Sequence, residues 1–453
     1  MSWKPELIET GKPKYLALAD ALEGDIASGR LRSGERLPPQ RELAADLGVT
    51  IATITRAIGE AHRRGLVSAR AGSGTFIRMP QAEEGLGTSL DLSLNTVPPG
   101  PAKPFLDDIL LEIASERRAE DFLNYQPAIG SERHRRAIVR WFERRIGELR
   151  LPDVALTHGA QHGLSACFAS LVRPGQAVAS EMWTYTGVRR LAAAAQAKLV
   201  GVAMDDEGLR PDDLEAQLAR SGARVLICST TVQNPTAATM SLARRREILA
   251  VCRRAEAVIV EDDIYGRLAD DPLPTLATLD PERVVYLGSV SKSTSPGLRL
   301  GLMVSPPRLS ADLQDKLVCL HWTAPTLYAE MFSRLVESGG ADRCVAQHGQ
   351  EMSRRLSVAR QHLGMPAVPS LPSYHLWLPT PDMWRLDDIV SDLLLQGLKV
   401  SPSTHFLVDD SAPAAPHIRV SLGAVENAEQ LDPALRTIAS VWRSRPRFSG
   451  AIV

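Results

Sequence analysis

Apolar positions follow three different patterns along the chain, and their order gives the first outline of its organisation. Between Tyr15 and Ser28 they recur every three to four residues, which predicts an amphipathic helix. Over residues 65–70 and 74–77 apolar and polar positions alternate, which predicts two short strands. Further along, short continuous apolar runs such as 257–260 and 284–287 are typical of buried strands in a parallel sheet. The chain therefore joins a small N-terminal segment to a longer α/β segment.

Residues 37–58 of the small segment carry the signals of two helices separated by a tight turn. Gly48 is expected to end the first of these helices, and Thr50 is expected to cap the second. Two helices around such a turn form a helix-turn-helix, whose second helix enters the DNA major groove. The two strands with their turn at 71–73 would then be a wing. A plain hairpin turn is the simpler interpretation of the same glycines, and it is compatible with DNA binding.

These features resemble the winged helix of the GntR family of regulators, which implies that residues 1–79 bind double-stranded operator DNA. Arginine is a strong candidate for a base contact, because arginine to guanine is the commonest specific contact. Where many relatives have arginine or lysine after the cap threonine, this chain has Ile51, so we expect an altered sequence preference. The expected DNA-binding residues are Arg41, Thr50, Thr53, Thr55, Arg56, Arg70, Gly72 and Ser73.

Charge adds little to this picture. Residues 1–79 hold twelve Lys and Arg against nine Asp and Glu, a net charge of plus three, whereas the whole chain of 453 residues has a net charge of −1. Neutralised phosphates supply much of the affinity for DNA, so this is a modest electrostatic footprint that a dimer would double. The whole-chain value excludes a globally basic DNA coat protein.

A second group of motifs follows the apolar runs of the longer segment. Asp262 comes directly after one run, with Tyr265 three positions on, while Lys292 follows the other run and Arg299 lies seven positions beyond it. Pyridoxal phosphate needs a lysine for its aldehyde, an anion for its ring nitrogen, and an arginine with hydroxyls for its phosphate. A single lysine or acidic loop would mean little, since most such residues are solvated. Here both motifs follow strands whose C-terminal ends are the usual ligand edge of an α/β sheet.

From about residue 90 onwards these motifs resemble the fold-type I aminotransferases, which depend on pyridoxal phosphate. The resemblance implies a multidomain chain: a winged-helix head, a linker at 80–90, a large α/β domain with a mostly parallel sheet at 91–305, and a smaller α+β domain at 306–453. It also implies that Lys292 forms the Schiff base with the cofactor. Asp262 would pair with the pyridine nitrogen, and Tyr265 would bond the phenolic oxygen.

The resemblance assigns further residues to the same site. Asn234 would face the phenolic oxygen, from a segment in which Ala237 replaces the usual glycine. Tyr185 matches the aromatic that stacks on the cofactor ring, with Trp183 as a rival and a core role open for either. Arg419 would bind the carboxylate of a ligand in a two-pronged way that lysine cannot copy. The phosphate would be held by Gly159, Ala160 and Gln161 at a helix N-terminus, together with Ser289, Ser291 and Arg299.

Tyr125 matches a tyrosine that reaches the phosphate of the neighbouring subunit, so the resemblance implies a homodimer with shared cofactor sites. We also expect a long helix between Leu313 and Leu335. The chain has no apolar stretch of the ~20 residues that a membrane span needs and no signal peptide, so we expect a cytoplasmic protein without a membrane partner. Its five widely spaced cysteines suggest neither a disulfide framework nor a metal site.

Together the two segments resemble the MocR subgroup of GntR regulators. The first hypothesis is a transcription factor that senses an amine, an amino acid or the cofactor itself at a Schiff-base site. A second hypothesis is a catalytically active aminotransferase with an accessory DNA-binding head. A third is that the cofactor serves only as a scaffold. The sequence leaves activation and repression equally open, because it does not give the sign of a coupling energy.

Overall fold

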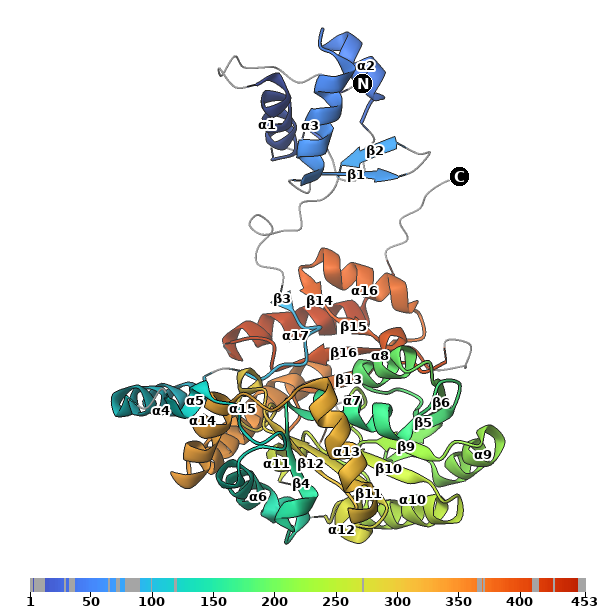
Figure 1. The fold of residues 1–453 in the computed structure, drawn as a ribbon. Coiled ribbons are helices and arrows are strands. Elements are labelled where there is room, and N and C mark those ends of the chain that lie inside the picture. The colour runs from blue at the N-terminus through green and yellow to red at the C-terminus, as the bar shows by residue number, and fades with distance from the viewer. Residues whose placement is uncertain are drawn as a thin grey trace. The chain divides into compact units, whose positions relative to one another are not determined.

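The computed structural model divides the chain into two compact units, Met1–Ser89 and Leu90–Val453, which are described separately here (Figure 1). Residues 80–89 of the predicted linker at 80–90 lie outside the described residues, as do the turn with Gly72 and Ser73 and the side chain of Arg70. The residues described are 3, 13–27, 30–31, 37–63, 66–70, 74–77, 90–98, 100–117, 120–270, 273–364, 369, 371–409, 415–426 and 428–446.

The N-terminal unit is the predicted winged helix. Its helices are α1 (Lys14–Ala27), α2 (Gln40–Asp46) and α3 (Ile51–Arg63), and its strands β1 (Val67–Arg70) and β2 (Gly74–Ile77) pair antiparallel. Leu18 and Leu22 of α1 and Ile54 and Ala61 of α3 are buried in its small core. The predicted helix-turn-helix is confirmed, because α2 and α3 are joined by a short turn.

The local signals that predicted this turn act as expected. Gly48 has a φ of +60°, in the left-handed region where glycine has no steric penalty. The side-chain oxygen of Thr50 accepts the backbone N–H of Thr53 at 3.2 Å, which caps the first turn of α3.

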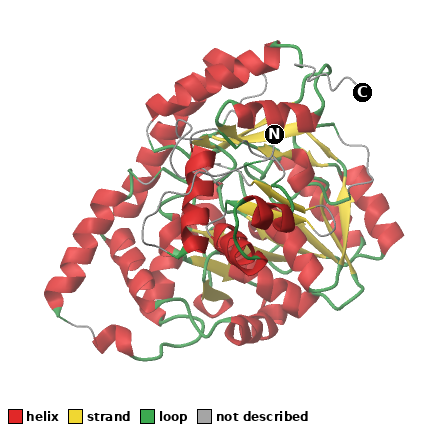
Figure 2. Cartoon of the chain, turned by 90° about the horizontal axis from the view of Figure 1, so that it is seen from above, coloured by secondary structure: helices red, strands yellow, loops and turns green. Residues whose placement is uncertain are grey.

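A seven-stranded sheet forms the centre of the C-terminal unit, with the strand order β4-β12-β11-β10-β9-β5-β6. Only β12 runs antiparallel to its neighbours, so the sheet is mostly parallel as predicted. Helices surround the sheet in Figure 2. Its strands are β4 (Val154–Thr157), β5 (Ala177–Glu181), β6 (Lys198–Val202), β9 (Val225–Cys228), β10 (Val258–Asp262), β11 (Val284–Ser289) and β12 (Gly301–Val304).

The two apolar runs that predicted buried strands form β10 and β11, which lie side by side and parallel, with Asp262 opposite Leu287. Alternate side chains of these strands enter different clusters of the core. Val260 and Leu287 pack in the cluster of α7 (Ala160–Leu171) and α13 (Pro307–Leu320), whereas Ile259 packs in the cluster of α9 (Pro211–Ser221) and α10 (Leu242–Arg254). Burial on both faces explains the absence of polar residues from the runs.

The remaining elements cover the sheet and build the C-terminal part. The helices are α4 (Lys103–Glu116), α5 (Glu120–Leu123), α6 (Glu132–Ile146), α7 (Ala160–Leu171), α8 (Thr186–Ala194), α9 (Pro211–Ser221), α10 (Leu242–Arg254), α11 (Gly266–Ala269), α12 (Leu276–Leu279), α13 (Pro307–Leu320), α14 (Thr326–Glu337), α15 (Gly340–Leu363), α16 (Leu386–Leu395) and α17 (Ala428–Arg443). The short helices are η1 (Leu151–Asp153), η2 (Pro296–Leu298) and η3 (Ser403–His405), and the other strands are β3 (Leu90–Asp91), β7 (Met204–Asp205), β8 (Gly208–Leu209), β13 (His375–Pro379), β14 (Leu398–Lys399), β15 (Ser401–Pro402) and β16 (His417–Ser421).

The long helix expected between Leu313 and Leu335 is wrong, because α13 ends at Leu320 and α14 begins at Thr326. Pro325 occupies the N-cap position of α14. A proline inside a helix lacks the N–H that a helical bond needs, and it disfavours a helical conformation in the residue before it. The apolar periodicity continued through this break and concealed it.

An antiparallel sheet of strand order β13-β16-β15 packs with α15, α16 and α17 in the C-terminal part, which has the predicted α+β character. Strand β3, at the start of the unit, pairs with β14 from this part. The boundary at residues 305 and 306 stays a prediction. Among the helices that the structure describes, none has both the length and the apolar character that a bilayer crossing requires.

Candidate functional site

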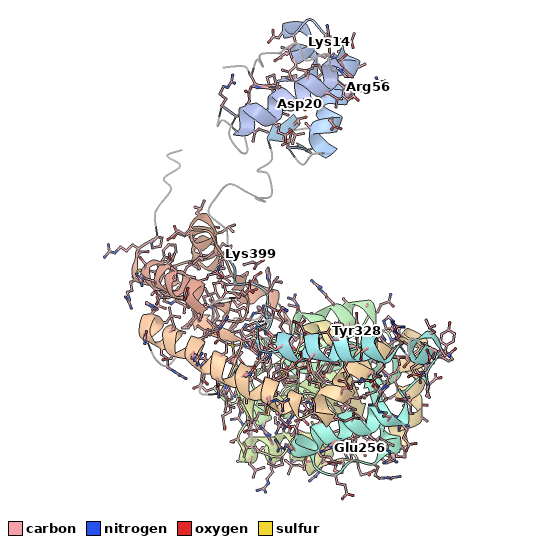
Figure 3. All side chains as sticks on the ribbon, turned by 90° about the vertical axis from the view of Figure 1, so that its left-hand side faces the viewer. Lys14, Asp20, Arg56, Glu256, Tyr328 and Lys399 are labelled. Carbon is pink, nitrogen blue, oxygen red and sulfur yellow. The ribbon has the colours of Figure 1, made fainter. Side chains whose placement is uncertain are left out.

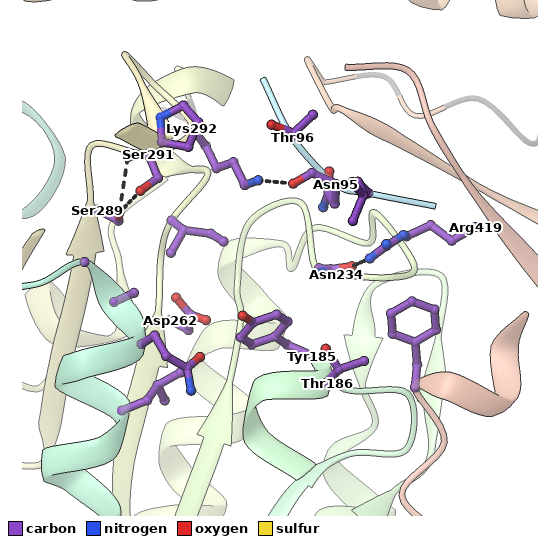
Figure 4. A pocket seen from close by; sticks show the side chains of 18 of the residues that line it. Asn95, Thr96, Tyr185, Thr186, Asn234, Asp262, Ser289, Ser291, Lys292 and Arg419 are labelled. Atoms are coloured by element: carbon purple, nitrogen blue, oxygen red, sulfur yellow. Dashed lines mark hydrogen bonds between the residues drawn. The ribbon is translucent and has the colours of Figure 1, made fainter. Parts of the chain in front are cut away.

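A cavity of about 520 Å³ lies in the C-terminal unit, at the ends of β10 and β11 (Figure 4). This is the edge of the sheet where the sequence placed its ligand site. Most of the expected cofactor and ligand residues line the cavity, although they come from segments far apart in the chain. They are Gly159, Ala160, Gln161, Tyr185, Asn234, Asp262, Ser289, Ser291, Lys292, Arg299 and Arg419.

Lys292 follows β11 and places its amine inside the cavity, where the amine donates a hydrogen bond to the carbonyl oxygen of Asn95 (Figure 4). Removal from water lowers the pKa of Lys292 to about 7, and the charges of Arg419 and Arg299 act in the same direction. A large fraction of this amine is therefore unprotonated near neutral pH. An unprotonated amine is the form that attacks a carbonyl carbon.

Asp262 is the last residue of β10, and its Oδ1 is buried without a hydrogen-bond partner among the described residues. Burial raises the pKa of Asp262 to about 7, with a further contribution from the charge of Asp263. By contrast, Asp263 accepts hydrogen bonds from Arg145 at 2.7 Å and from Tyr286 at 2.9 Å. Buried carboxylate oxygens almost always have donors, so the unpaired oxygen of Asp262 indicates a donor that a ligand supplies.

Groups that bind anions also line the cavity. Gly159 caps the N-terminus of α7 with a φ of +73°, and a Cβ atom there would lie 3.5 Å from the guanidinium of Arg299. The hydroxyl of Ser289 donates to that of Ser291 at 3.0 Å. A helix N-terminus, two hydroxyls and a guanidinium together match the donors that a phosphate accepts. This donor set and the unpaired Asp262 oxygen fit pyridoxal phosphate.

Arg419 lies on β16 and is buried beside the cavity. Its guanidinium donates to the Asn234 side-chain oxygen at 2.8 Å and to the Ser93 carbonyl at 2.6 Å, and it stacks on the ring of Phe406 at 4.7 Å. Burial lowers the pKa of Arg419 to about 10. Its Nε is buried and has no partner among the described residues. The guanidinium is therefore fixed in orientation while one of its donors stays unused.

Two of the expected site residues do not line the cavity. Tyr265 is buried behind it, and its hydroxyl accepts a hydrogen bond from the Asn95 amide at 2.7 Å. Tyr125 is 89% exposed and contacts only the ring of Trp322 among the described aromatic side chains, with 6.0 Å between centroids. The expected contact of Tyr125 with a neighbouring subunit stays a prediction.

The structure separates the two candidates for the stacking ring. Tyr185 lines the cavity (Figure 4), whereas Trp183 packs against Trp377 and His417 with centroid distances of 5.6 and 5.4 Å. Trp183 therefore takes the packing role that is common for an isolated aromatic side chain.

Ala237 has a left-handed backbone conformation, which glycine adopts most readily. Its φ is +61°, and its N–H donates to the Gln233 carbonyl at 2.6 Å, so the turn after Asn234 is closed. A left-handed conformation costs an L-residue about 1 to 2 kcal/mol relative to glycine. Tertiary contacts of the segment, such as the bond between Asn234 and Arg419, offset this cost.

Several residues of the cavity were not found from the sequence. Asn95 comes from the segment after β3, and its amide and carbonyl contact Tyr265 and Lys292. Arg190 on α8 and His405 on η3 also line the cavity. The alternation of polar and apolar residues at 90–95 indicates a strand edge, but no motif marks these three positions.

In the N-terminal unit, the expected DNA-binding face is open to solvent. Arg41, Thr50, Thr55 and Arg56 are exposed, and Arg56 projects from the unit in Figure 3. The hydroxyls of Thr50 and Thr53 lie 2.9 Å apart, and Thr55 donates to the Gln40 side chain at 2.9 Å. Ile51 is 50% exposed on this face.

Comparisons with known proteins agree with both units. Residues 88–438 match the family model for aminotransferase class I and II, and residues 14–77 match the bacterial regulatory proteins of the gntR family. The chain is 29% identical over 444 residues to the uncharacterized HTH-type transcriptional regulator YdeF of Bacillus subtilis (strain 168), with 96% of each chain covered. It is 29% identical over 331 residues to the probable rhizopine catabolism regulatory protein MocR of Rhizobium meliloti, with 66% of each covered.

Solved structures show the same fold for the larger unit. The kynurenine aminotransferase of Pyrococcus horikoshii superimposes with a TM-score of 0.72 at 22% identity, covering 79% of this chain and 91% of that one. The chain therefore belongs to the aminotransferase class I and II family, carries a GntR-type DNA-binding domain at residues 14–77, and is similar to HTH-type transcriptional regulators that include MocR.

Proposed function

We propose that this regulator binds pyridoxal phosphate in the cavity, senses an amine or amino acid there, and changes its affinity for operator DNA in response. One observation carries the proposal. The amine of Lys292, the unpaired oxygen of Asp262 and the anion-binding groups around Arg299 all line one cavity. Nothing in the sheet itself requires this combination of charged groups, and the unpaired oxygen of Asp262 is costly to bury unless a ligand compensates for it.

Each of these residues has a distinct role in the proposal. Pyridoxal phosphate supplies, when bound, an aldehyde that condenses with primary amines. Lys292 provides the resident amine, and Asp262 accepts a hydrogen bond from the ring nitrogen. Arg299, Ser289 and the N–H groups at the start of α7 hold the phosphate. Asn234 faces the phenolic oxygen of the cofactor. Tyr265 contacts that oxygen either directly or through Asn95.

An effector amine would compete with Lys292 for the cofactor's aldehyde, and the Lys292 side chain would then be free as an amine. The effector's carboxylate binds Arg419, whose planar guanidinium is already oriented by Asn234 and Ser93. Binding alters DNA affinity only if the effector prefers one arrangement of the protein over another. The contacts of Arg419 on β16 with Asn234 in the sheet domain provide a link that an effector can strengthen or break.

We also propose that the protein is a homodimer and acts in the cytoplasm, where its DNA is. Tyr125 and Leu123 are 89% and 79% exposed, and Trp322 beside them is 55% exposed. Large apolar side chains gathered on one exposed surface are typical of an interface. Tyr125 would then reach the phosphate in the partner's cavity.

The test is to measure affinity for the DNA that flanks the gene, with cofactor and with a panel of amino acids. We expect at least one amino acid to change the affinity of the wild-type protein and to leave Lys292→Ala unchanged. Lys198→Ala, which alters an exposed lysine of β6, is the matched control and should respond like the wild type. An equal response from Lys292→Ala would refute sensing through this amine and leave the cofactor as a scaffold.

A second candidate function is catalysis of transamination. The lowered pKa of Lys292, about 7, favours it, because a lysine freed from the cofactor can then accept a proton near neutral pH. Mixing the loaded protein with amino acids and a keto acid distinguishes the two functions. Steady production of new keto acid over many turnovers would establish the enzyme, whereas a single spectral change without turnover is expected of a sensor.

A further inference from the structure

The cavity holds more positive charge than the proposed function uses. Four basic residues line it, Arg190, Lys292, Arg299 and Arg419, against the single carboxylate of Asp262 among the described lining residues. In the proposed function, Arg299 binds phosphate, Lys292 meets the aldehyde, and Arg419 takes the effector's α-carboxylate. Arg190 has no such role, and no described residue forms an ion pair with it.

The position of Arg190 is set by α8. It lies four residues after Thr186, which also lines the cavity (Figure 4), so one face of the helix presents both side chains to it. The neighbouring Arg189 donates to the carbonyl oxygens of Thr404 at 3.1 Å and His405 at 2.7 Å. These bonds fix η3 against α8. They bring His405, another lining residue, to the same wall of the cavity as Arg190.

Arg190 and Tyr185 line the same cavity, and the charge of Arg190 acts on the Tyr185 hydroxyl. Burial raises the pKa of Tyr185, and the charges of Arg299, Arg190 and Arg419 oppose this rise. The three arginines therefore surround the volume that Tyr185 faces. Arg419 is buried and the Lys292 amine lies inside the cavity, whereas Arg190 and His405 are exposed, so Arg190 is a basic group of the cavity that lies nearer to solvent.

We infer that the effector carries two acidic groups, as a dicarboxylic α-amino acid does, and that Arg190, with His405, binds the second group while Arg419 binds the first. This rests on the proposed function, since it takes the cofactor and Arg419 as given. A side-chain carboxylate would supply the counter-charge that Arg190 lacks, through a charge-assisted hydrogen bond. A neutral side chain of the same shape would leave Arg190 without one.

The experiment compares isosteric pairs of ligands on the full-length protein loaded with pyridoxal phosphate. L-glutamate and L-glutamine, and L-aspartate and L-asparagine, are titrated while the visible spectrum is recorded. We expect the acid of at least one pair to bind about three- to tenfold more tightly than its amide, since a partly exposed ion pair contributes modestly. The preference should shrink as ionic strength rises.

Variants identify the residue responsible. Arg190→Gln should bring the ratio of acid to amide affinity close to one while the cofactor stays bound. Arg246→Gln removes an exposed arginine of α10 that does not line the cavity, and it should keep the wild-type ratio. If Arg190→Gln keeps the preference for the acid, the assignment of Arg190 is wrong. Weaker cofactor binding with an unchanged ratio of acid to amide affinity would also overturn it, because Arg190 would then act at the phosphate.

The outcomes separate this inference from the proposed function. If neutral and acidic amino acids perturb the spectrum equally, the dicarboxylate class is wrong and sensing through Lys292 stands. If no amino acid perturbs the spectrum of the loaded protein, the proposed function itself fails. A preference for the acids that disappears in Arg190→Gln and persists in Arg246→Gln supports both the proposed function and the dicarboxylate inference.

Discussion

The two units of this chain place their functional side chains in opposite environments. In the N-terminal unit, Arg41 and Arg56 are exposed and already solvated. In the C-terminal unit, Asp262 and Arg419 are buried, and each has a polar atom without a partner among the described residues. Water has already satisfied the exposed groups, so each new contact adds little net free energy, whereas a buried unpaired group makes ligand binding strongly favourable. Substitutions should therefore cost more in the cavity than on the DNA-binding face.

The largest effect after loss of Lys292 is expected at Arg419. Arg419→Met keeps much of the side-chain volume but removes the charge that we assign to the effector's carboxylate. It should weaken binding of a carboxylate-bearing amine by about 2 to 5 kcal/mol, as loss of one partner of a buried charge pair does. Spectral titration measures this. An amine of similar size without a carboxylate is the control, and an equal loss for both ligands would contradict the assignment.

Arg41→Ala and Arg56→Ala test the exposed side of the comparison. Each should lower DNA affinity by about 1 to 3 kcal/mol if it makes a bidentate base contact. Gel-shift titration of the wild type and both variants gives the values. Native affinity in both variants would show that base contacts lie elsewhere. A loss of DNA affinity larger than the loss of ligand affinity in Arg419→Met would contradict the expectation that substitutions cost more in the cavity.

The rate at which the apo protein takes up pyridoxal phosphate should depend on pH through Lys292. Its pKa is lowered to about 7, so the reactive amine is lost as pH falls below that value. The rate should then fall about tenfold per pH unit, and it should level off above pH 8 because the amine is fully unprotonated. Stopped-flow absorbance measures it. The rate for free lysine, whose pKa is unshifted, should keep rising with pH well above pH 8. If the rate for the protein also keeps rising above pH 8, the amine is not buried.

The smallest effect is expected at Ile51, an exposed apolar residue on the DNA-binding face. Ile51→Arg adds one charge that can meet a phosphate. It should raise affinity for unrelated DNA slightly and steepen the dependence of log affinity on log salt by about 0.9 per site. Ile51→Gln is the uncharged control. An unchanged salt slope in Ile51→Arg would show that this position does not approach the DNA backbone.

The sequence predicted the parts of the molecule that local rules determine. Apolar runs gave β10 and β11, and therefore the positions of Asp262 and Lys292 at one edge of a sheet. Thr50 and Gly48 gave the turn of the DNA-binding motif. The apolar periodicity also gave one wrong prediction. It continues past Pro325, so it predicted one long helix where the structure has α13 and α14.

The parts that the sequence did not predict depend on long-range contacts. Asn95 meets Lys292 across 197 positions, through a segment that pairs with β14 and carries no motif of its own. Arg190 and His405 reach the cavity because Arg189 joins α8 to η3. Packing brings such residues together, and their chemistry alone does not mark them among many similar surface residues.

The central claim is that one amine in the C-terminal unit binds a vitamin B6 aldehyde. The direct measurement is a titration of the purified apo protein with pyridoxal phosphate, followed by visible absorption, in parallel with Lys292→Ala. The account predicts a saturable visible band with one cofactor per chain in the wild type and none in the variant. A wild-type protein that stays colourless, or a variant that develops the same band, would contradict it.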